Sequence, residues 1–139
     1  MAIGNKVADA PQTQVGLLGR LSLGNFIFGA DYVYNDNLYS HFDPTQRQAN
    51  DDGSIDREQS YKIESYGVIN ALAQYNFTIV GLKSNFRINV YNLANKKYAM
   101  EGWDNATRDD NGEYNHSKEN FMGFWGYERT FNFALKVNF

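Results

Sequence analysis

The end of the chain alternates between apolar side chains and small or polar ones. Apolar residues occupy every second position, namely Phe131, Phe133, Leu135, Val137 and Phe139, and the positions between them hold Asn132, Ala134, Lys136 and Asn138. A period of two is the side-chain period of a β-strand. The sequence therefore predicts a terminal strand with one apolar face and one largely polar face.

The same alternation recurs upstream and predicts five strands in all. Their expected ranges are 12–23, 25–39, 61–77, 85–99 and 122–139. The pattern is imperfect, because four apolar residues fall on the polar face: Leu18, Ile27, Val33 and Leu72. Helical periodicity is absent throughout. The expected fold is all-β, an antiparallel up-and-down meander of about five strands.

The connections between these strands alternate between short and long. Leu23-Gly24-Asn25 and residues 78–84 are short, whereas residues 40–60 and 100–121 are long and polar. Alternate connections of a meander lie at the same end, so the long ones should share one end. They also carry eleven of the sixteen acidic residues: Asp43, Asp51, Asp52, Asp56, Glu58, Glu101, Asp104, Asp109, Asp110, Glu113 and Glu119. Short turns at one end and long loops at the other are typical of outer-membrane barrels.

The composition fits strands that cross a membrane. Aromatic residues make up 16% of the chain, yet the mean hydropathy is -0.58. No run approaches the roughly 18 apolar residues of a transmembrane helix, but barrel strands alternate and are not hydrophobic on average. Two aromatic belts are expected, because such rings favour the membrane interface. One comprises Tyr32, Tyr34, Tyr39, Tyr61, Tyr66, Tyr98, Trp125 and Tyr127, and the other Phe26, Tyr75, Phe77, Phe86 and Phe139.

Alternation alone leaves other folds open, because turning a barrel inside out does not change the period. A small soluble β-barrel that binds a ligand in an apolar cavity is one alternative. A third is an outer-membrane barrel for adhesion or structure. Five strands are fewer than the eight of the smallest bacterial barrels and leave two unpaired edges. Either further strands complete the sheet, or the fold is soluble.

Several other classes of function are not supported. The chain has no cysteine, which excludes thiolate metal sites, and its net charge of -3 gives no basis for nucleic-acid binding. Residues 51–56 resemble part of a calcium loop, but Gln59 stands where an EF-hand needs Glu. His41 and His116 lie in separate loops and are expected to be solvated. No nucleophile elbow or phosphate-binding loop occurs, so we expect neither an enzyme nor a cofactor or metal.

Three segments resemble the C-terminal barrel strands of TonB-dependent receptors, especially the Bacteroidetes type. They are residues 126–131 (Gly-Tyr-Glu-Arg-Thr-Phe) with the alternation to Phe139, residues 89–98 (Asn-Val-Tyr-Asn-Leu-Ala-Asn-Lys-Lys-Tyr), and Asp9-Ala10-Pro11 before the first strand. The likeness covers the chain from about Asp9. The residues that carry the signature are Asn92, Leu93, Asn95, Tyr98, Gly126, Arg129, Thr130 and Phe131.

This resemblance implies a location in the bacterial outer membrane and a role in transport. Receptors of this family have about twenty-two strands around a plug, so residues 1–139 would be the C-terminal portion of the barrel, without the plug domain. The implied partners are outer-membrane lipid, the remaining strands and plug, TonB and the barrel-assembly machinery. The barrel-assembly machinery would recognise the terminal strand. The residues of this strand that would face lipid are Phe131, Phe133, Leu135, Val137 and Phe139.

The implied activity is energy-coupled uptake of a substrate such as an iron chelate, haem, cobalamin or a glycan. These strands do not identify the substrate. Receptors of this kind capture substrates at the outer mouth, where aromatic side chains suit sugars and flat chelates. Trp103 and Tyr114 are therefore weak ligand-binding candidates, with packing between loops as their simpler role.

Overall fold

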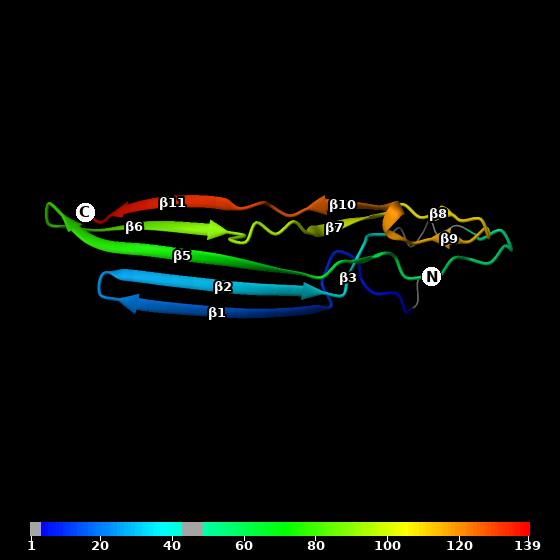
Figure 1. Ribbon diagram of the computed structural model, residues 1–139, viewed down its shortest axis with the longest axis horizontal. Coiled ribbons are helices and arrows are strands. Elements are labelled where there is room, and N and C mark those ends of the chain that lie inside the picture. The colour runs from blue at the N-terminus through cyan, green and yellow to red at the C-terminus, as the bar shows by residue number, and fades with distance from the viewer. Residues whose placement is uncertain (1–3, 43–48) are drawn as a thin grey trace. The chain divides into compact units, whose positions relative to one another are not determined.

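The computed structural model describes residues 4–42 and 49–139, and it is all-β apart from one short 3-10 helix (Figure 1). Asp43, one of the loop acids counted above, lies outside the described residues. The chain divides into two compact units. The sheet unit comprises Gln14–Tyr34, Tyr66–Lys97 and Tyr127–Phe139, and the loop unit comprises Met1–Thr13, Asn35–Ser65 and Tyr98–Gly126.

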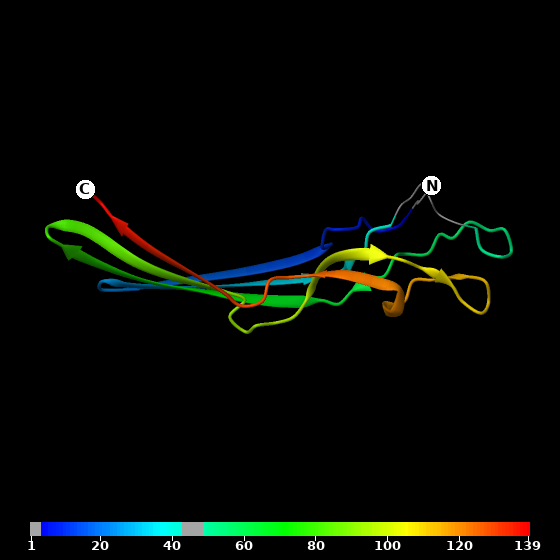
Figure 2. The same ribbon diagram turned by 90° about the horizontal axis from the view of Figure 1, so that it is seen from above.

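The sheet unit consists of one antiparallel sheet, which confirms the predicted meander of five strands. The strands are β1 (Thr13–Leu23), β2 (Phe26–Asp36), β5 (Tyr66–Ile79), β6 (Leu82–Tyr91) and β11 (Thr130–Val137). They lie in the order β1-β2-β5-β6-β11, so β1 and β11 are its edges. Figure 2 shows these strands as a single layer. Among the described residues, no helix has the length and apolarity needed to span a membrane.

Two-residue turns join the hairpins of this sheet. Gly24 and Asn25 separate β1 from β2, and Val80 and Gly81 separate β5 from β6. Gly24, Val80 and Gly81 all have positive φ angles, of 57°, 50° and 77°. Positive φ is the backbone requirement of the tight turns that match the twist of antiparallel strands. The second turn is shorter than the connection predicted over residues 78–84, because β5 and β6 both extend into that range.

One face of the sheet carries a continuous group of aromatic side chains. In the strand register Tyr75 lies opposite Phe86, and Phe86 lies opposite Leu135. The rings of Phe26 and Tyr75 are 4.7 Å apart, and those of Phe86 and Phe133 are 6.5 Å apart. The residues with the predicted period of two therefore share one face, and the aromatic residues near the tight turns contact one another.

The other face carries polar side chains that bond across the strands. Asn70 Nδ2 donates to Asp31 Oδ2 over 2.7 Å, which links β5 to β2. Two guanidinium nitrogens of Arg87 donate to Gln74 Oε1 over 3.0 and 2.7 Å. Asn89 Nδ2 donates to Asn132 Oδ1 over 3.1 Å, which links β6 to β11. The two faces thus differ sharply in chemistry.

Burial in the sheet unit is the reverse of that in a soluble domain. The buried residues of this unit are polar, namely Gln74, Ser84 and Asn92. Phe131, Phe133 and Leu135 are 55–65% exposed. Soluble domains bury their large apolar side chains and rarely leave a broad apolar patch in water. Residues 14–34, 66–97 and 127–139, which make up the sheet unit, therefore form no apolar core of their own.

Among its described residues, the loop unit holds three pairs of short antiparallel strands and the 3-10 helix. Its elements are β3 (Leu38–Tyr39) paired with β4 (Lys62–Ile63), β7 (Ala99–Asp104) paired with β10 (Phe121–Trp125), β8 (Thr107–Arg108) paired with β9 (Tyr114–Asn115), and η1 (Lys118–Asn120). Leu38, Ile63 and Ala99 form its small buried apolar core. The long polar stretches therefore contain secondary structure that the alternation did not predict.

Several predicted strand boundaries were wrong, and at two of them the chain turns at an asparagine with a positive φ angle. The strand expected over 85–99 stops at Tyr91, and Asn92 follows with a φ of 50°. The strand expected over 25–39 divides at Asn37, whose φ is 53°. The strands expected over 61–77 and 122–139 are each interrupted too, as β4 with β5 and β10 with β11. Asparagine tolerates positive φ, where a strand cannot continue.

Candidate functional site

Asn92, the first signature residue, fixes the chain where β6 ends. Its side chain is nearly enclosed, and the residue is 2% exposed. Its Oδ1 accepts the backbone N–H of Lys96 over 2.8 Å, and its Nδ2 donates to the carbonyl oxygens of Lys96 and Tyr127 over 2.8 and 3.0 Å. Its own N–H donates to Asn70 Oδ1 over 3.0 Å. One side chain thus connects the turn after β6 to the segment before β11.

The other signature residues reinforce this connection. Asn95, at a φ of 52°, accepts the backbone N–H of Arg129 on its side-chain oxygen over 2.8 Å. The N–H of Leu93 donates to the carbonyl oxygen of Ile69 over 2.7 Å. Thr130 begins β11 opposite Tyr91, and Phe131 lies opposite Val90. We call the contacts of Asn92 and Asn95 with residues 96, 127 and 129 the asparagine clamp.

Tyr98 and Gly126 meet within the loop unit. The N–H of Gly126 donates to the carbonyl oxygen of Tyr98 over 2.8 Å. A Cβ atom on Gly126 would clash with the Tyr98 ring, so any larger residue would require this ring to move. The signature spacing therefore reflects a close approach of residues 98 and 126.

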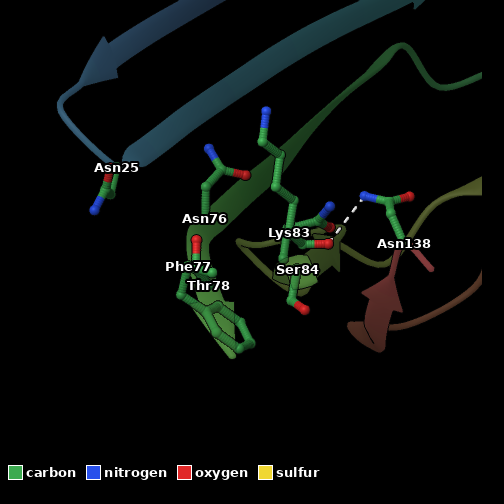
Figure 3. A pocket seen from close by; sticks show the side chains of 8 residues that line it. Asn25, Asn76, Phe77, Thr78, Lys83, Ser84 and Asn138 are labelled. Atoms are coloured by element: carbon green, nitrogen blue, oxygen red, sulfur yellow. Dashed lines mark hydrogen bonds between the residues drawn. The ribbon is translucent and has the colours of Figure 1, made fainter. Parts of the chain in front are cut away.

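The terminal strand presents its apolar residues on one face, as the period of two predicts. Phe133, Leu135 and Val137 lie opposite Ile88, Phe86 and Ser84 of β6. After the strand ends, both the backbone N–H and the Nδ2 of Asn138 donate to the carbonyl oxygen of Lys83 over 3.0 Å. Figure 3 shows this contact in a polar pocket of about 360 Å³ near the tight turns. Asn25, Asn76 and Lys83 also line this pocket.

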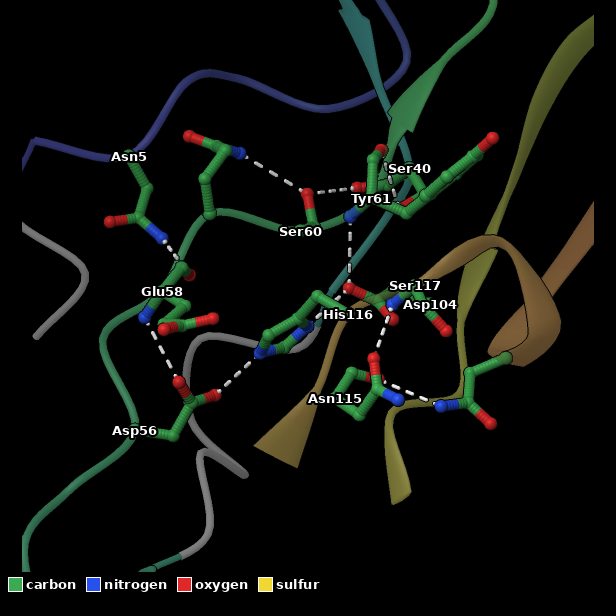
Figure 4. Close-up of polar contacts among 12 residues, drawn as sticks. Asn5, Ser40, Asp56, Glu58, Ser60, Tyr61, Asp104, Asn115, His116 and Ser117 are labelled. Carbon is green, nitrogen blue, oxygen red and sulfur yellow. Dashed lines mark hydrogen bonds and ion pairs between the residues drawn. The ribbon is translucent and has the colours of Figure 1, made fainter. Parts of the chain in front are cut away.

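His116 occupies the most enclosed ionic cluster among the described residues (Figure 4). Its Nδ1 lies 2.6 Å from Asp104 Oδ2, and its Nε2 lies 3.1 Å from Asp56 Oδ2. The side chains of His116, Asp56 and Asp104 are 10%, 6% and 1% exposed. The expectation that His116 is a solvated loop histidine was therefore wrong.

The hydrogen bond with Asp104 raises the pKa of His116 above its ordinary value of 6.5. Burial opposes this rise in pKa, and the negative charges of Asp104 and Asp56 add to it. A protonated imidazole donates from both ring nitrogens, whereas a neutral one donates from only one. The protonated ring therefore fits a position between two carboxylates better than the neutral ring does.

The acids of the calcium-like segment 51–56 have separate partners. Asp51 pairs with Arg108, Asp52 Oδ1 accepts the N–H of Ser54, and Asp56 faces His116. Within residues 4–42 and 49–139, no group of three or more His, Cys, Asp or Glu side chains is arranged to hold a metal ion. The segment thus forms contacts between loops and presents no shared set of ligands.

Trp103 and Tyr114, the weak ligand-binding candidates, lie on different strands of the loop unit, β7 and β9. Trp103 packs edge-on against His41, with ring centroids 4.2 Å apart, and lines a pocket of about 360 Å³ with Asp9, Glu101 and Phe124. His41 is half-exposed and pairs with Asp9 over 3.3 Å. The guanidinium of Arg108 lies 5.6 Å from the centre of the Tyr114 ring. Only Trp103 of the two lines this pocket.

Sequence reasoning missed the role of His116 because its partners are remote, at 12 and 60 residues along the chain. No local motif marks such a contact. The side chains around Asn92 and His116 contact other groups of this chain, so we infer that they hold loops in position. Comparison of the chain with protein-family models, with curated proteins and with solved structures found no match in any of the three.

Proposed function

We propose that the sheet unit is part of the wall of a bacterial outer-membrane β-barrel, with its apolar face toward lipid. One observation carries this proposal: the sheet unit exposes its large apolar side chains and buries polar ones. A closed barrel satisfies its backbone hydrogen bonds within the membrane, and its lipid-facing side chains are apolar. In a bilayer, the exposed apolar face of β11 would contact the hydrocarbon of the lipid.

The polar face supports the same orientation. The bonds from Asn70 to Asp31, from Arg87 to Gln74 and from Asn89 to Asn132 satisfy polar groups in pairs across neighbouring strands. Side chains of this kind suit the interior of a barrel, which is polar. The short turns within the sheet and the long connections gathered in the loop unit also fit the pattern of such barrels.

The direction of the edge strands bears on how such a barrel would close. An antiparallel sheet of five strands has edges that run in the same direction, as the arrows of β1 and β11 do in Figure 1. Antiparallel closure therefore needs an odd number of additional strands between β11 and β1. The proposal thus places these strands within a larger barrel.

We further propose that this barrel belongs to a TonB-dependent receptor, a transporter and not an enzyme. The support is the resemblance of the signature residues, together with a physical role for them in the asparagine clamp and the Tyr98–Gly126 contact. The function is then energy-coupled uptake of a substrate across the outer membrane. A plug domain encoded upstream in the same reading frame is the observation that would separate a transporter from a barrel used for adhesion or structure.

The orientation of the sheet can be tested with single cysteines, because the chain has none of its own. We would attach a bimane fluorophore at residues 131 to 137, one position at a time, in the full chain reconstituted with lipid. Nitroxide-labelled lipid should quench the odd positions strongly and the even positions weakly, because successive strand residues point to opposite faces.

The soluble alternative predicts a different result. A chain that stays monomeric and folded in plain buffer, with residues 131, 133 and 135 shielded from both iodide and nitroxide lipid, would overturn the membrane proposal. Circular dichroism and light scattering on the same samples establish whether the chain is folded and monomeric. Quenching that does not alternate along a folded β11 would also contradict the proposed orientation.

A further inference from the structure

The two long connections of the loop unit are joined by backbone hydrogen bonds, such as that from the N–H of His41 to the carbonyl oxygen of Gly102, by the ring contact of Tyr61 with Phe121, and by ion pairs. We define the first connection as residues 40–65, of which 40–42 and 49–65 are described, and the second as residues 98–126. Arg108 bonds to Asp51 and to the carbonyl oxygen of Ala49, and Lys118 pairs with Glu64. These ion pairs are exposed, and exposed pairs contribute little to stability.

The contact of His116 with its two aspartates is enclosed, in contrast to those pairs. Asp56 comes from the first connection, while Asp104 and His116 come from the second. Asp104 Oδ2 also accepts the N–H of Tyr61, a residue of the first connection, over 3.1 Å. The imidazole therefore bridges the two connections through Asp56, and Asp104 bridges them through Tyr61.

With both carboxylates ionised, protonation of His116 lowers the net charge of these three side chains from −2 to −1. Asp104 Oδ1 is buried without a hydrogen-bond partner among the described residues, so this carboxylate depends on its contacts through Oδ2. A buried carboxylate is costly unless a cation and hydrogen bonds compensate it. Loss of the ring proton would turn a nitrogen lone pair toward one of the two carboxylates, and that contact would change from attractive to repulsive.

Other charged groups of the described residues lie near this cluster. Glu58 and Lys62 line a pocket of about 520 Å³ that His116 also lines, as do Tyr39 and Tyr61. Lys62 pairs with Asp36 over 3.2 Å. Glu58 approaches Asp56 through its backbone N–H, over 2.9 Å. His116 contacts both carboxylates, one through each ring nitrogen.

We propose that His116 is a proton-operated latch that holds the two long connections together beside the pocket that both of them line. The pocket takes its lining from both connections, with Ser60 and Tyr61 on one and Asn115 and Ser117 on the other. Separation of the connections would widen it. The latch depends only on contacts within the loop unit, so it stands whether or not the sheet faces lipid.

The direction of the pH dependence follows from the protonation of His116. Its pKa is raised in the folded chain, mainly by the hydrogen bond with Asp104. A group with a raised pKa contributes its full stabilisation below its ordinary pKa and loses it as the pH rises through the raised value. The latch is therefore closed below about pH 6.5 and opens as the pH rises through the raised pKa of His116.

Spin labels on the two connections can test the latch in the full chain. Arg57 and Glu119 are exposed and belong to different connections, so Arg57→Cys with Glu119→Cys accepts one label on each. Double electron–electron resonance should give one narrow distance distribution at pH 6 and a broader, longer one at pH 9. His116→Gln should give the broad distribution at both pH values, because it cannot carry the charge.

Two further variants keep this test decisive. His41→Gln changes the other histidine and should retain the full pH response. Asp56→Asn leaves the Asp104 contact in place and should shift the transition to lower pH, because it removes one of the charges that favour the imidazolium. A distribution in the wild-type chain that does not change with pH, or a narrow one in a folded His116→Gln chain, would overturn the proposal.

Discussion

At the scale of single residues, Asn92 is the position where one side chain does most to organise the backbone. Asn92→Ala would leave the carbonyl oxygens of Lys96 and Tyr127 without their donor and would put alanine at a φ of 50°. We expect a loss of about 2–4 kcal/mol of unfolding free energy, since buried groups left without partners and positive φ both carry a cost. Denaturant titration in the medium where the chain folds measures this loss.

Asn95→Ala is the matched control, because Asn95 has a similar backbone angle and makes one side-chain bond to the backbone N–H of Arg129. Its cost should be smaller, about 1–2 kcal/mol, because the residue is exposed. Equal losses of unfolding free energy for the two substitutions would contradict a larger contribution of Asn92 than of Asn95 to the clamp.

Val80 offers a prediction of the opposite sign. It is 95% exposed and has a φ of 50°, an angle that β-branched residues rarely adopt. Val80→Asn should raise the unfolding free energy by about 1 kcal/mol, because asparagine tolerates this conformation. Leu82→Asn, two residues along in β6, lacks this benefit and serves as the control. No gain in thermal midpoint for Val80→Asn would mean that the turn is not strained.

At the scale of elements, the terminal strand allows its two faces to be compared directly. Phe133→Arg would place a charge on the proposed lipid face and should destabilise the chain in lipid by about 2–4 kcal/mol. Asn132→Arg, one residue earlier on the polar face, loses only an exposed bond with Asn89 and should cost less than about 1 kcal/mol. Similar costs measured in lipid vesicles would argue against the proposed orientation.

The elements also show how far the sequence could predict the fold. A period of two is a local property, so it correctly predicted five antiparallel strands and the shared face of Phe133 and Leu135. The breaks after Tyr91 and before Thr130 depend on Asn92, whose side chain bonds to Tyr127, 35 residues away in the sequence. The spacing of apolar residues does not predict such a bond. His116 was missed for the same reason, because Asp56 reaches it from 60 residues away.

At the scale of the whole molecule, the two units differ in what they bury, and this difference predicts how each responds to loss of amphiphile. The loop unit buries Leu38, Ile63 and Ala99, whereas the apolar face of the sheet unit is exposed. Removal of detergent should therefore speed hydrogen exchange in β5 and β6 by roughly tenfold or more, since about 1.4 kcal/mol of lost stability is one decade. The N–H of Ser40, which donates to the carbonyl oxygen of Tyr61 within the loop unit, should change less. Mass spectrometry of the exchanged chain can compare these segments in one sample. Unchanged protection of β5 and β6 in plain buffer would mean that their apolar face is covered by protein and not by lipid.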